Sequence, residues 1–260
     1  MKLLLVWLLC GFVANAQTST SPPPRPTLFL IGDSTVRNGR GDGAGALWGW
    51  GDLLAEHFDT NKIRVVNRAL GGRSSRTFLT EGLWEKVRAE LHPGDFVLMQ
   101  FGHNDGGEMA KGDRPRASIK GNSDESKTVT IEKTGQTETV QSYGWYLRRF
   151  ISETKAAGAT PIVLSPIPRN IWKEGKVARA SNDYGKWAAE AAASAGVQFI
   201  DLNELIAHRY EEIGETRVRE EFFTAADHTH TTRAGAKLNA ESVAVGLRNL
   251  KMPILTNSLR

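Results

Sequence analysis

The sequence reads Thr27-Leu28-Phe29-Leu30-Ile31-Gly32-Asp33-Ser34-Thr35 where its first buried strand is expected. The apolar run ends at a glycine, and an acid and a hydroxyl follow side by side. A serine just past the end of a buried strand is held rigidly and still reaches the surface, as a nucleophile must. Gly-Asp-Ser is also ordinary turn chemistry, and a three-residue motif alone favours a turn. The case for catalysis therefore depends on the rest of the chain.

Apolar runs of strand length alternate with helix-like segments along the chain. Each run is largely continuous, which is typical of a strand covered on both faces. The runs are Leu28–Ile31, Ile63–Asn67, Phe96–Phe101, Pro161–Ser165 and Val197–Asp201. Helices are expected at Trp48–His57, Leu79–Leu91, Tyr143–Ala157, Asn182–Ala195 and Arg233–Leu250, the last capped by Thr231 or Thr232. This alternation predicts an α/β protein with a three-layer, flavodoxin-like fold and a central parallel five-stranded sheet.

The bulk composition is that of an ordinary globular protein. The chain has 260 residues and a formal charge of +4, and its basic residues are scattered rather than clustered. No nucleic-acid partner is expected from this distribution. With no repeat and no visible internal boundary, we expect one domain over residues 27–252, acting as a monomer.

The N-terminus indicates export. A lysine, a short leucine-rich run and Ala14-Asn15-Ala16 predict a signal peptide over residues 1–16, cleaved after Ala16. Cys10, the only cysteine, lies inside it, and the large Leu9 before it argues against a lipoprotein. Residues 17–26 form a proline-rich linker. The mature protein should be secreted or periplasmic, with no membrane association after cleavage.

A polar insertion interrupts the alternation between about residues 106 and 141. A segment of this length without clear elements is usually a functional lid or disordered. Within it, Thr128–Ile131 and Thr137–Val140 flank a glycine-containing turn and predict an exposed hairpin. We expect the insertion to form a flap over the site and to shape substrate choice.

Polar segments follow the predicted strands, and parallel strands bring their carboxyl ends to one edge of the sheet. The segments are Gly32–Thr35, Asn67–Ser74, Gly102–Asp105 and, before the last helix, Ala226–His230. Together they supply a hydroxyl, glycine amides, a carboxamide, a carboxylate and imidazoles. These are the groups that acyl transfer requires.

Roles follow from the chemistry of each group. Ser34 needs a base, which His230 provides, and Asp227 can fix the imidazole tautomer. The backbone N–H groups of Ser34 and Gly72 and the side-chain amide of Asn104 can stabilise the oxyanion.

The same segments resemble the sequence blocks of the SGNH (GDSL-type) hydrolases. Within that superfamily the chain is most similar to rhamnogalacturonan acetylesterases of carbohydrate esterase family 12, through Gly49-Trp50-Gly51, Asn67–Ser74, Gln100–Asp105 and Asp227–His230. The resemblance covers about residues 27–250. It implies removal of O-acetyl groups from an acetylated polysaccharide, pectic rhamnogalacturonan, without metal or cofactor. Arg73, His103 and Trp172 are weaker candidates for substrate contact, through a galacturonate carboxylate or by stacking on a sugar.

Some residues also match the patterns of other functions. Gly39–Ala44 matches a dinucleotide fingerprint but begins several residues after the strand, which favours a plain loop. His228, His230, Asp227 and His103 could start a metal site, yet the triad uses the set without one. An esterase or lipase acting on another glycan or acyl ester remains the enzymatic alternative. A carbohydrate-binding module would leave the ordered Ser, Gly, Asn and Asp-x-x-His set without a purpose.

Overall fold

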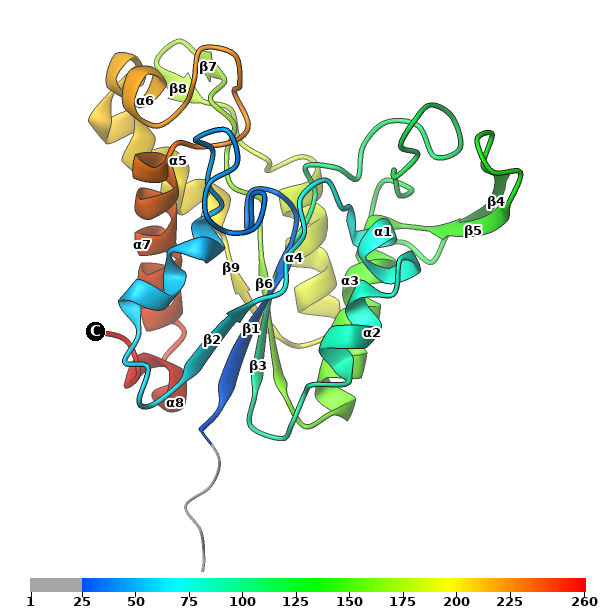
Figure 1. Cartoon of the computed structure of the whole chain (residues 1–260), viewed down its shortest axis with the longest axis horizontal. Coiled ribbons are helices and arrows are strands. Elements are labelled where there is room, and N and C mark those ends of the chain that lie inside the picture. Colours follow the sequence, from blue (N-terminus) through cyan, green and yellow to red (C-terminus); the bar gives the residue numbers. More distant parts are fainter. Residues whose placement is uncertain (1–24) are drawn as a thin grey trace, which may run out of the picture.

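A computed structural model describes residues 25–260, so the predicted signal peptide and most of the proline-rich linker lie outside the described residues. Five parallel strands form the central sheet (Figure 1) in the order β2-β1-β3-β6-β9. They are β1 (Thr27–Gly32), β2 (Arg64–Asn67), β3 (Phe96–Gln100), β6 (Thr160–Leu164) and β9 (Gln198–Ile200). The predicted α/β class and parallel five-stranded sheet are confirmed.

Successive side chains of β1 point to opposite faces of the sheet and enter two separate cores. Leu28 and Leu30 pack in one core, and Phe29 and Ile31 in the other, all fully buried. The first core lies against η1 (Trp50–Asp52), η2 (Leu54–His57), α5 (Leu202–Ile213), α6 (Glu215–Glu221), α7 (Arg233–Asn249) and α8 (Pro253–Thr256). The second lies against α1 (Ser75–Thr80), α2 (Leu83–Arg88), α3 (Tyr143–Ala156) and α4 (Tyr184–Ser194).

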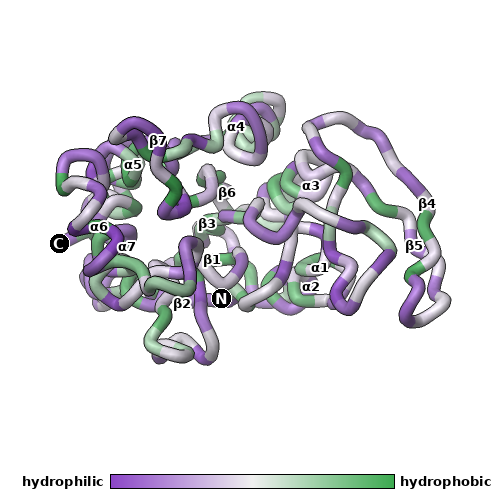
Figure 2. The backbone as a smooth tube through the Cα atoms, turned by 90° about the horizontal axis from the view of Figure 1, so that it is seen from above, coloured by the Kyte–Doolittle hydropathy of each residue, from purple (hydrophilic) through white to green (hydrophobic). Residues whose placement is uncertain are grey.

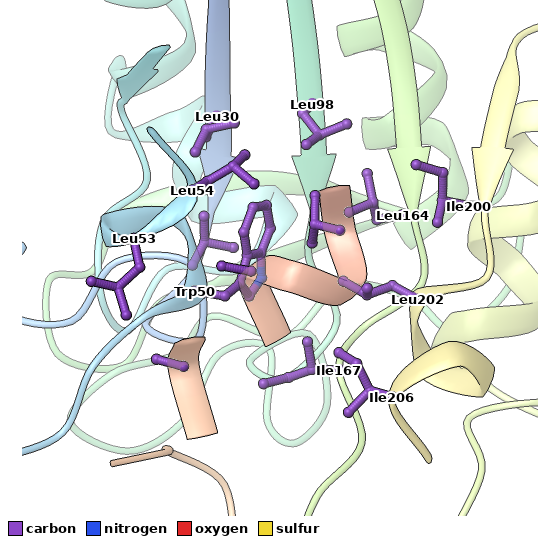
Figure 3. Packing of buried hydrophobic residues seen from close by; sticks show 14 of the residues in the cluster. Leu30, Trp50, Leu53, Leu54, Leu98, Leu164, Ile167, Ile200, Leu202 and Ile206 are labelled. Atoms are coloured by element: carbon purple, nitrogen blue, oxygen red, sulfur yellow. The ribbon is translucent and has the colours of Figure 1, made fainter. Parts of the chain in front are cut away.

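Trp50 is the largest fully buried side chain of the first core, and it packs near the carboxyl ends of the strands (Figure 3). Figure 3 shows it near Leu30 and Leu98, with Leu164 and Ile200 on the next strands. The indole is 1% exposed. An aromatic side chain buried here stiffens the segment that follows β1.

Two predicted helices are broken in the structure. Residues 48–57 form the 3₁₀ helices η1 and η2, because the Gly51 N–H donates to the Val36 carbonyl and a Cβ at Gly49 would lie 2.3 Å from the Val36 carbonyl carbon. Residues 79–91 divide between α1 and α2 at Gly82, which has a φ of 70°. Thr232 caps α7 through the Gly235 N–H, as expected.

The insertion does contain the predicted hairpin. Strands β4 (Ser126–Thr130) and β5 (Thr137–Gln141) pair antiparallel. Figures 1 and 2 show the hairpin projecting past α1 and α3, away from the sheet. Only the loop before β4 therefore approaches the carboxyl ends of the strands.

The C-terminal residues belong to the same fold. Leu255 of α8 is fully buried, and Phe58 forms a backbone bridge with Leu259. The folded chain thus continues past residue 252, where we expected the domain to end. Among the helices of residues 25–260, none is long and apolar enough to cross a membrane.

Candidate active site

The site lies where the strand order reverses. β1 is the second strand of the sheet and β3 runs beside it in parallel, so the segments after both strands leave the sheet at one edge. In open α/β sheets this switch point is where ligands bind. Ser34 follows β1 and Asn104 follows β3, so both lie at this point.

A buried hydrogen-bond network holds the turn after β1. The Asp33 carboxylate accepts from the Thr35 N–H at 2.8 Å and from its hydroxyl at 2.7 Å. The Gln100 amide donates to the Thr35 hydroxyl at 2.6 Å and accepts from the Trp50 indole at 2.8 Å. Because its neighbours on both sides are fixed, Ser34 is presented in one orientation. Asp33 braces this turn.

Ser34, His230 and Asp227 form a continuous hydrogen-bonded chain. Ser34 Oγ lies 2.7 Å from His230 Nε2, and His230 Nδ1 lies 2.7 Å from Asp227 Oδ2. Asp227 Oδ1 accepts from the backbone N–H groups of Thr229 at 2.7 Å and His230 at 2.9 Å. When Nδ1–H donates to the carboxylate, Nε2 keeps a lone pair for the serine proton.

The loop stabilises the ionised form of Asp227. Partial burial alone would raise the pKa of its carboxyl, but the two backbone N–H groups and the His230 ring outweigh that effect and hold the pKa below its ordinary value. The carboxylate therefore stays charged to a lower pH than that of an unperturbed aspartate. An anionic partner at Nδ1 is what an imidazolium needs for stabilisation.

Hydrogen-bond donors are available beside the serine hydroxyl. Within residues 25–260, the backbone N–H groups of Ser34 and Gly72 donate to no other residue. The Asn104 side-chain amide donates one hydrogen to the Arg73 carbonyl at 3.0 Å, which orients the group and leaves its second hydrogen free to turn outward. All three residues line one cleft of about 470 Å³ together with His230. The sequence-predicted catalytic and oxyanion residues are thus brought together.

Gly72 is suited to this position for two reasons. Its φ of 76° lies in the left-handed region, and a Cβ would stand 2.2 Å from Nη2 of Arg114. Gly82 has a similar φ of 70° but open space around it.

We expect Gly72→Ala and Gly82→Ala each to lower the free energy of unfolding by about 1–2 kcal/mol, because L-residues are strained at positive φ. Only Gly72→Ala should also lower kcat on p-nitrophenyl acetate, by about tenfold, since strain at this positive φ shifts the Gly72 N–H that faces the cleft. Urea denaturation and initial rates measure both effects. Equal activity of the two variants would contradict the steric argument.

The weaker sequence candidates lie in different places. His103 lines the cleft, and burial lowers the pKa of its imidazole. Arg73 is turned to α1, where its guanidinium pairs with Glu81 at 2.8 Å and donates to the Gly71 carbonyl. The Trp172 indole donates to Asn170 and packs against the core. Neither Arg73 nor Trp172 is among the residues that line the cleft.

Sequence reasoning missed three arginines that line the cleft, Arg114, Arg116 and Arg169. Arg114 and Arg116 come from the insertion, and Arg169 follows β6. A signal was available only for Arg114 and Arg116. In the Arg-Pro-Arg triplet at 114–116, two basic side chains stand two residues apart in the loop predicted to cover the site.

Buried polar contacts fasten the insertion to α1. Arg76 of α1 is 1% exposed, makes a two-bond ion pair with Glu138 of β5, and donates to the carbonyls of Met109 and Ala117. Such a buried pair fixes the loop geometry. The insertion is therefore fastened to α1 beside the cleft, which Arg114 and Arg116 line, and its action as a flap stays a prediction.

Asp105, next to Asn104, is a second fastening point. Its carboxyl accepts from the N–H of Ser75 at 3.1 Å and from the hydroxyls of Ser75 and Ser118. Burial raises its pKa from the ordinary 3.8 to about 7. One buried group thus joins the segment that carries Asn104 to α1 and to the insertion.

The sequence also left open a metal site and a dinucleotide-binding loop. The described part of the chain has the geometry of neither. Across residues 25–260, no group of three or more His, Cys, Asp or Glu side chains is placed to hold a metal ion. The segment 39–44 is a loop with Gly39, Gly41 and Gly43 at positive φ, well removed from the end of β1.

The site and fold together define a class of protein. The sequence pattern of the GDSL-like lipase/acylhydrolase family matches residues 30–238, and the chain belongs to this family. The protein is therefore a carboxylic ester hydrolase.

Named relatives are more specific than the family. The chain is 33% identical over 216 residues to a rhamnogalacturonan acetylesterase of Emericella nidulans, covering 83% of this chain and 82% of that protein. It is also 33% identical over 235 residues to a probable rhamnogalacturonan acetylesterase of Bacillus subtilis, covering 89% and 96%.

Solved structures agree on the fold. The chain is similar to the crystal structure of protein YXIM from Bacillus subtilis, with a TM-score of 0.69, 25% identity, and coverage of 88% of this chain and 57% of that one. An acetylxylan esterase from Geobacillus stearothermophilus matches with a TM-score of 0.51 and 19% identity, covering 85% and 93%. At that identity the second likeness concerns the fold alone.

Proposed function

We propose that the protein removes O-acetyl groups from acetylated rhamnogalacturonan, with Ser34 as nucleophile, His230 as base and Asp227 as the orienting acid. The observation that carries the proposal is the Ser34–His230–Asp227 hydrogen-bonded chain, placed beside the donors of Gly72 and Asn104 on one cleft. The two relatives that are 33% identical support the substrate. Export with cleavage after Ala16 is part of the proposal, because such a polymer lies outside the cell.

The first half-reaction transfers the acetyl group to the enzyme. Ser34 Oγ attacks the acetyl carbonyl carbon while its proton passes to His230 Nε2. The carbonyl oxygen becomes an oxyanion, which the N–H groups of Ser34 and Gly72 and the Asn104 amide stabilise. The carbon–oxygen bond to the sugar then breaks, and His230 Nε2 returns the proton to the departing sugar oxygen.

The second half-reaction releases acetate. A water molecule attacks the acetyl carbonyl carbon of Ser34 and gives a proton to His230 Nε2. The same donors stabilise the second oxyanion. The bond to Ser34 Oγ breaks, the proton returns to it, and acetic acid leaves as acetate. Throughout, ionised Asp227 holds the imidazole in one tautomer.

The cleft suits a polar substrate better than a long acyl chain. Its lining consists mostly of charged, hydroxyl, amide and imidazole side chains, with Ala226 as the only aliphatic one. A fatty acyl chain would gain little from burial here, because the hydrophobic contribution scales with the apolar area covered. A small acetyl ester on a hydroxyl-rich sugar fits this lining.

Acetate release tests the proposal on acetylated rhamnogalacturonan, acetylated xylan and p-nitrophenyl acetate. The wild type should act best on rhamnogalacturonan, and Ser34→Ala should lose activity on all three substrates while remaining folded. Near-wild-type turnover by Ser34→Ala would overturn the mechanism. Release from xylan alone would keep the mechanism and reject the substrate. Activity only on long acyl esters would indicate a lipase.

A further inference from the structure

The rim of the cleft has an uncompensated positive charge. Arg114, Arg116 and Arg169 line it, and within the described chain none of them forms an ion pair with a carboxylate. The one acid among the lining residues is Asp227, whose two oxygens are occupied by His230 and the adjacent backbone. Three guanidinium groups therefore face a cleft whose one lining carboxylate already accepts hydrogen bonds from His230 and the loop backbone.

The three arginines differ in their exposure and in how many of their hydrogen-bond donors are already used. Arg116 is half-buried and donates to the Gly72 carbonyl at 3.0 Å, which docks the insertion on the oxyanion segment. Arg114 is exposed, with its guanidinium against Gly72, and Arg169 is exposed, with one contact to the His103 carbonyl at 3.3 Å. Arg114 and Arg169 thus keep most of their donors for a ligand.

Electrostatic repulsion within the group favours an anionic ligand. Burial lowers the pKa of the Arg116 guanidinium, and the nearby charge of Arg114 lowers it further. Like charges held together in a partly buried site are stabilised when an anion enters. A guanidinium also presents a planar pair of donors that matches a carboxylate.

The cleft offers room beyond the acetylated sugar. A second cavity of about 440 Å³ adjoins it, and His103 and Arg169 line both. Each cavity falls in the size range of small-molecule sites. Arg169 therefore stands between two spaces, where it can reach a group on either of two consecutive sugars.

We propose that Arg114 and Arg169 bind a uronate carboxylate of the polysaccharide, on the sugar that carries the acetyl ester or on its neighbour. This inference rests on the proposed function and deepens it, because it makes the charge of the polymer a determinant of specificity. It assigns the carboxylate contact to the two exposed arginines of the rim. Arg73, the candidate for this contact in the sequence, pairs with Glu81 instead.

An alternative role for the same arginines is stabilisation of the oxyanion. Arg114 lies close to the Gly72 donor, so this role has to be separated from substrate binding. The two roles differ in one respect. Oxyanion stabilisation affects every ester, whereas carboxylate binding affects only esters that carry a carboxylate.

A matched pair of substrates separates the two roles. Acetylated rhamnogalacturonan oligosaccharides are compared with the same oligosaccharides after methyl esterification of their carboxylates, and p-nitrophenyl acetate is the neutral reference. The wild type should favour the charged form by about a hundredfold in kcat/KM. Arg114→Gln and Arg169→Gln should each raise KM for that form about tenfold, as expected for the loss of one charge-assisted contact.

Arg217→Gln is the matched control, because it removes the same charge from an exposed position on α6 that does not line the cleft. It should leave all three rates unchanged. An equal loss on the charged form, the methyl ester and p-nitrophenyl acetate would overturn the inference in favour of oxyanion stabilisation. No preference of the wild type for the charged form would also overturn it, while leaving the acetylesterase function intact. Release of acetate from neither oligosaccharide, with p-nitrophenyl acetate still hydrolysed, would instead reject the proposed function.

Discussion

Replacement of Asp227 by asparagine is expected to lower kcat on p-nitrophenyl acetate by about 10⁴-fold, the size of effect known for this change in a serine protease triad. The reason lies in the loop. Asp227 Oδ1 accepts two backbone N–H groups, from Thr229 and His230, so an asparagine must place its carbonyl oxygen there. Its amide then faces His230 Nδ1 as a donor. This moves the imidazole proton to Nε2, where no lone pair remains for the proton of Ser34.

The measurement is a kcat comparison with Asp113→Asn as the control. Asp113 is 99% exposed in the insertion, so its change removes the same charge without touching the triad. Asp227→Asn should unfold at nearly the wild-type urea concentration, because both backbone contacts of the loop are kept. A kcat within tenfold of the wild type in the folded variant would show that the tautomer argument does not apply.

The arrangement of the candidate site could be predicted from the sequence because each group follows the end of a strand or precedes a helix. Parallel pairing places the residues after β1 and β3 at one edge, whatever the details of packing. The Asp-x-x-His spacing adds a local constraint, since Asp227 and His230 share one short loop. These constraints are short-range or topological, so they can be inferred from the sequence pattern.

The arginines of the rim depend on long-range contacts that no local pattern encodes. Arg114 reaches the cleft because the insertion is held by Arg76, which contacts Glu138 62 residues away and two carbonyls of the loop. Arg73 shows the converse. It is adjacent in sequence to Gly72, which lines the cleft, but its side chain is turned toward Glu81.

The break in the helix predicted at residues 48–57 also results from tertiary contacts that a local pattern does not encode. Residues 48–57 have a helical pattern, yet close approach to Val36 requires glycines at 49 and 51 and directs the Gly51 N–H out of a helical ladder. Helix propensity is a weak preference that tertiary contacts override. The segment is therefore not a regular α-helix, and its backbone is held against Thr35 and Val36, the two residues that follow Ser34.

Asp105→Asn is expected to make the protein more stable than the wild type at pH 8, with little difference at pH 4. Burial raises the pKa of Asp105 from 3.8 to about 7, so between these values the folded state holds a proton that the unfolded state has lost. Wild-type stability from this group therefore falls as the pH rises through that window, by up to about 4 kcal/mol. Asparagine does not titrate and removes this slope.

The geometry of the site shows why asparagine should fit. Asp105 Oδ1 accepts from the Ser75 N–H and from the hydroxyls of Ser75 and Ser118, and asparagine retains an oxygen there. Its amide replaces Oδ2, whose one contact is a longer bond of 3.2 Å from the Ser75 N–H. Urea unfolding of the wild type, Asp105→Asn and the exposed control Asp113→Asn at pH 4, 6 and 8 measures the effect. A stability difference between Asp105→Asn and the wild type that stays constant with pH would mean that Asp105 is ionised in the folded state. In that case its charge would lie beside Asn104 at every pH at which the esterase works.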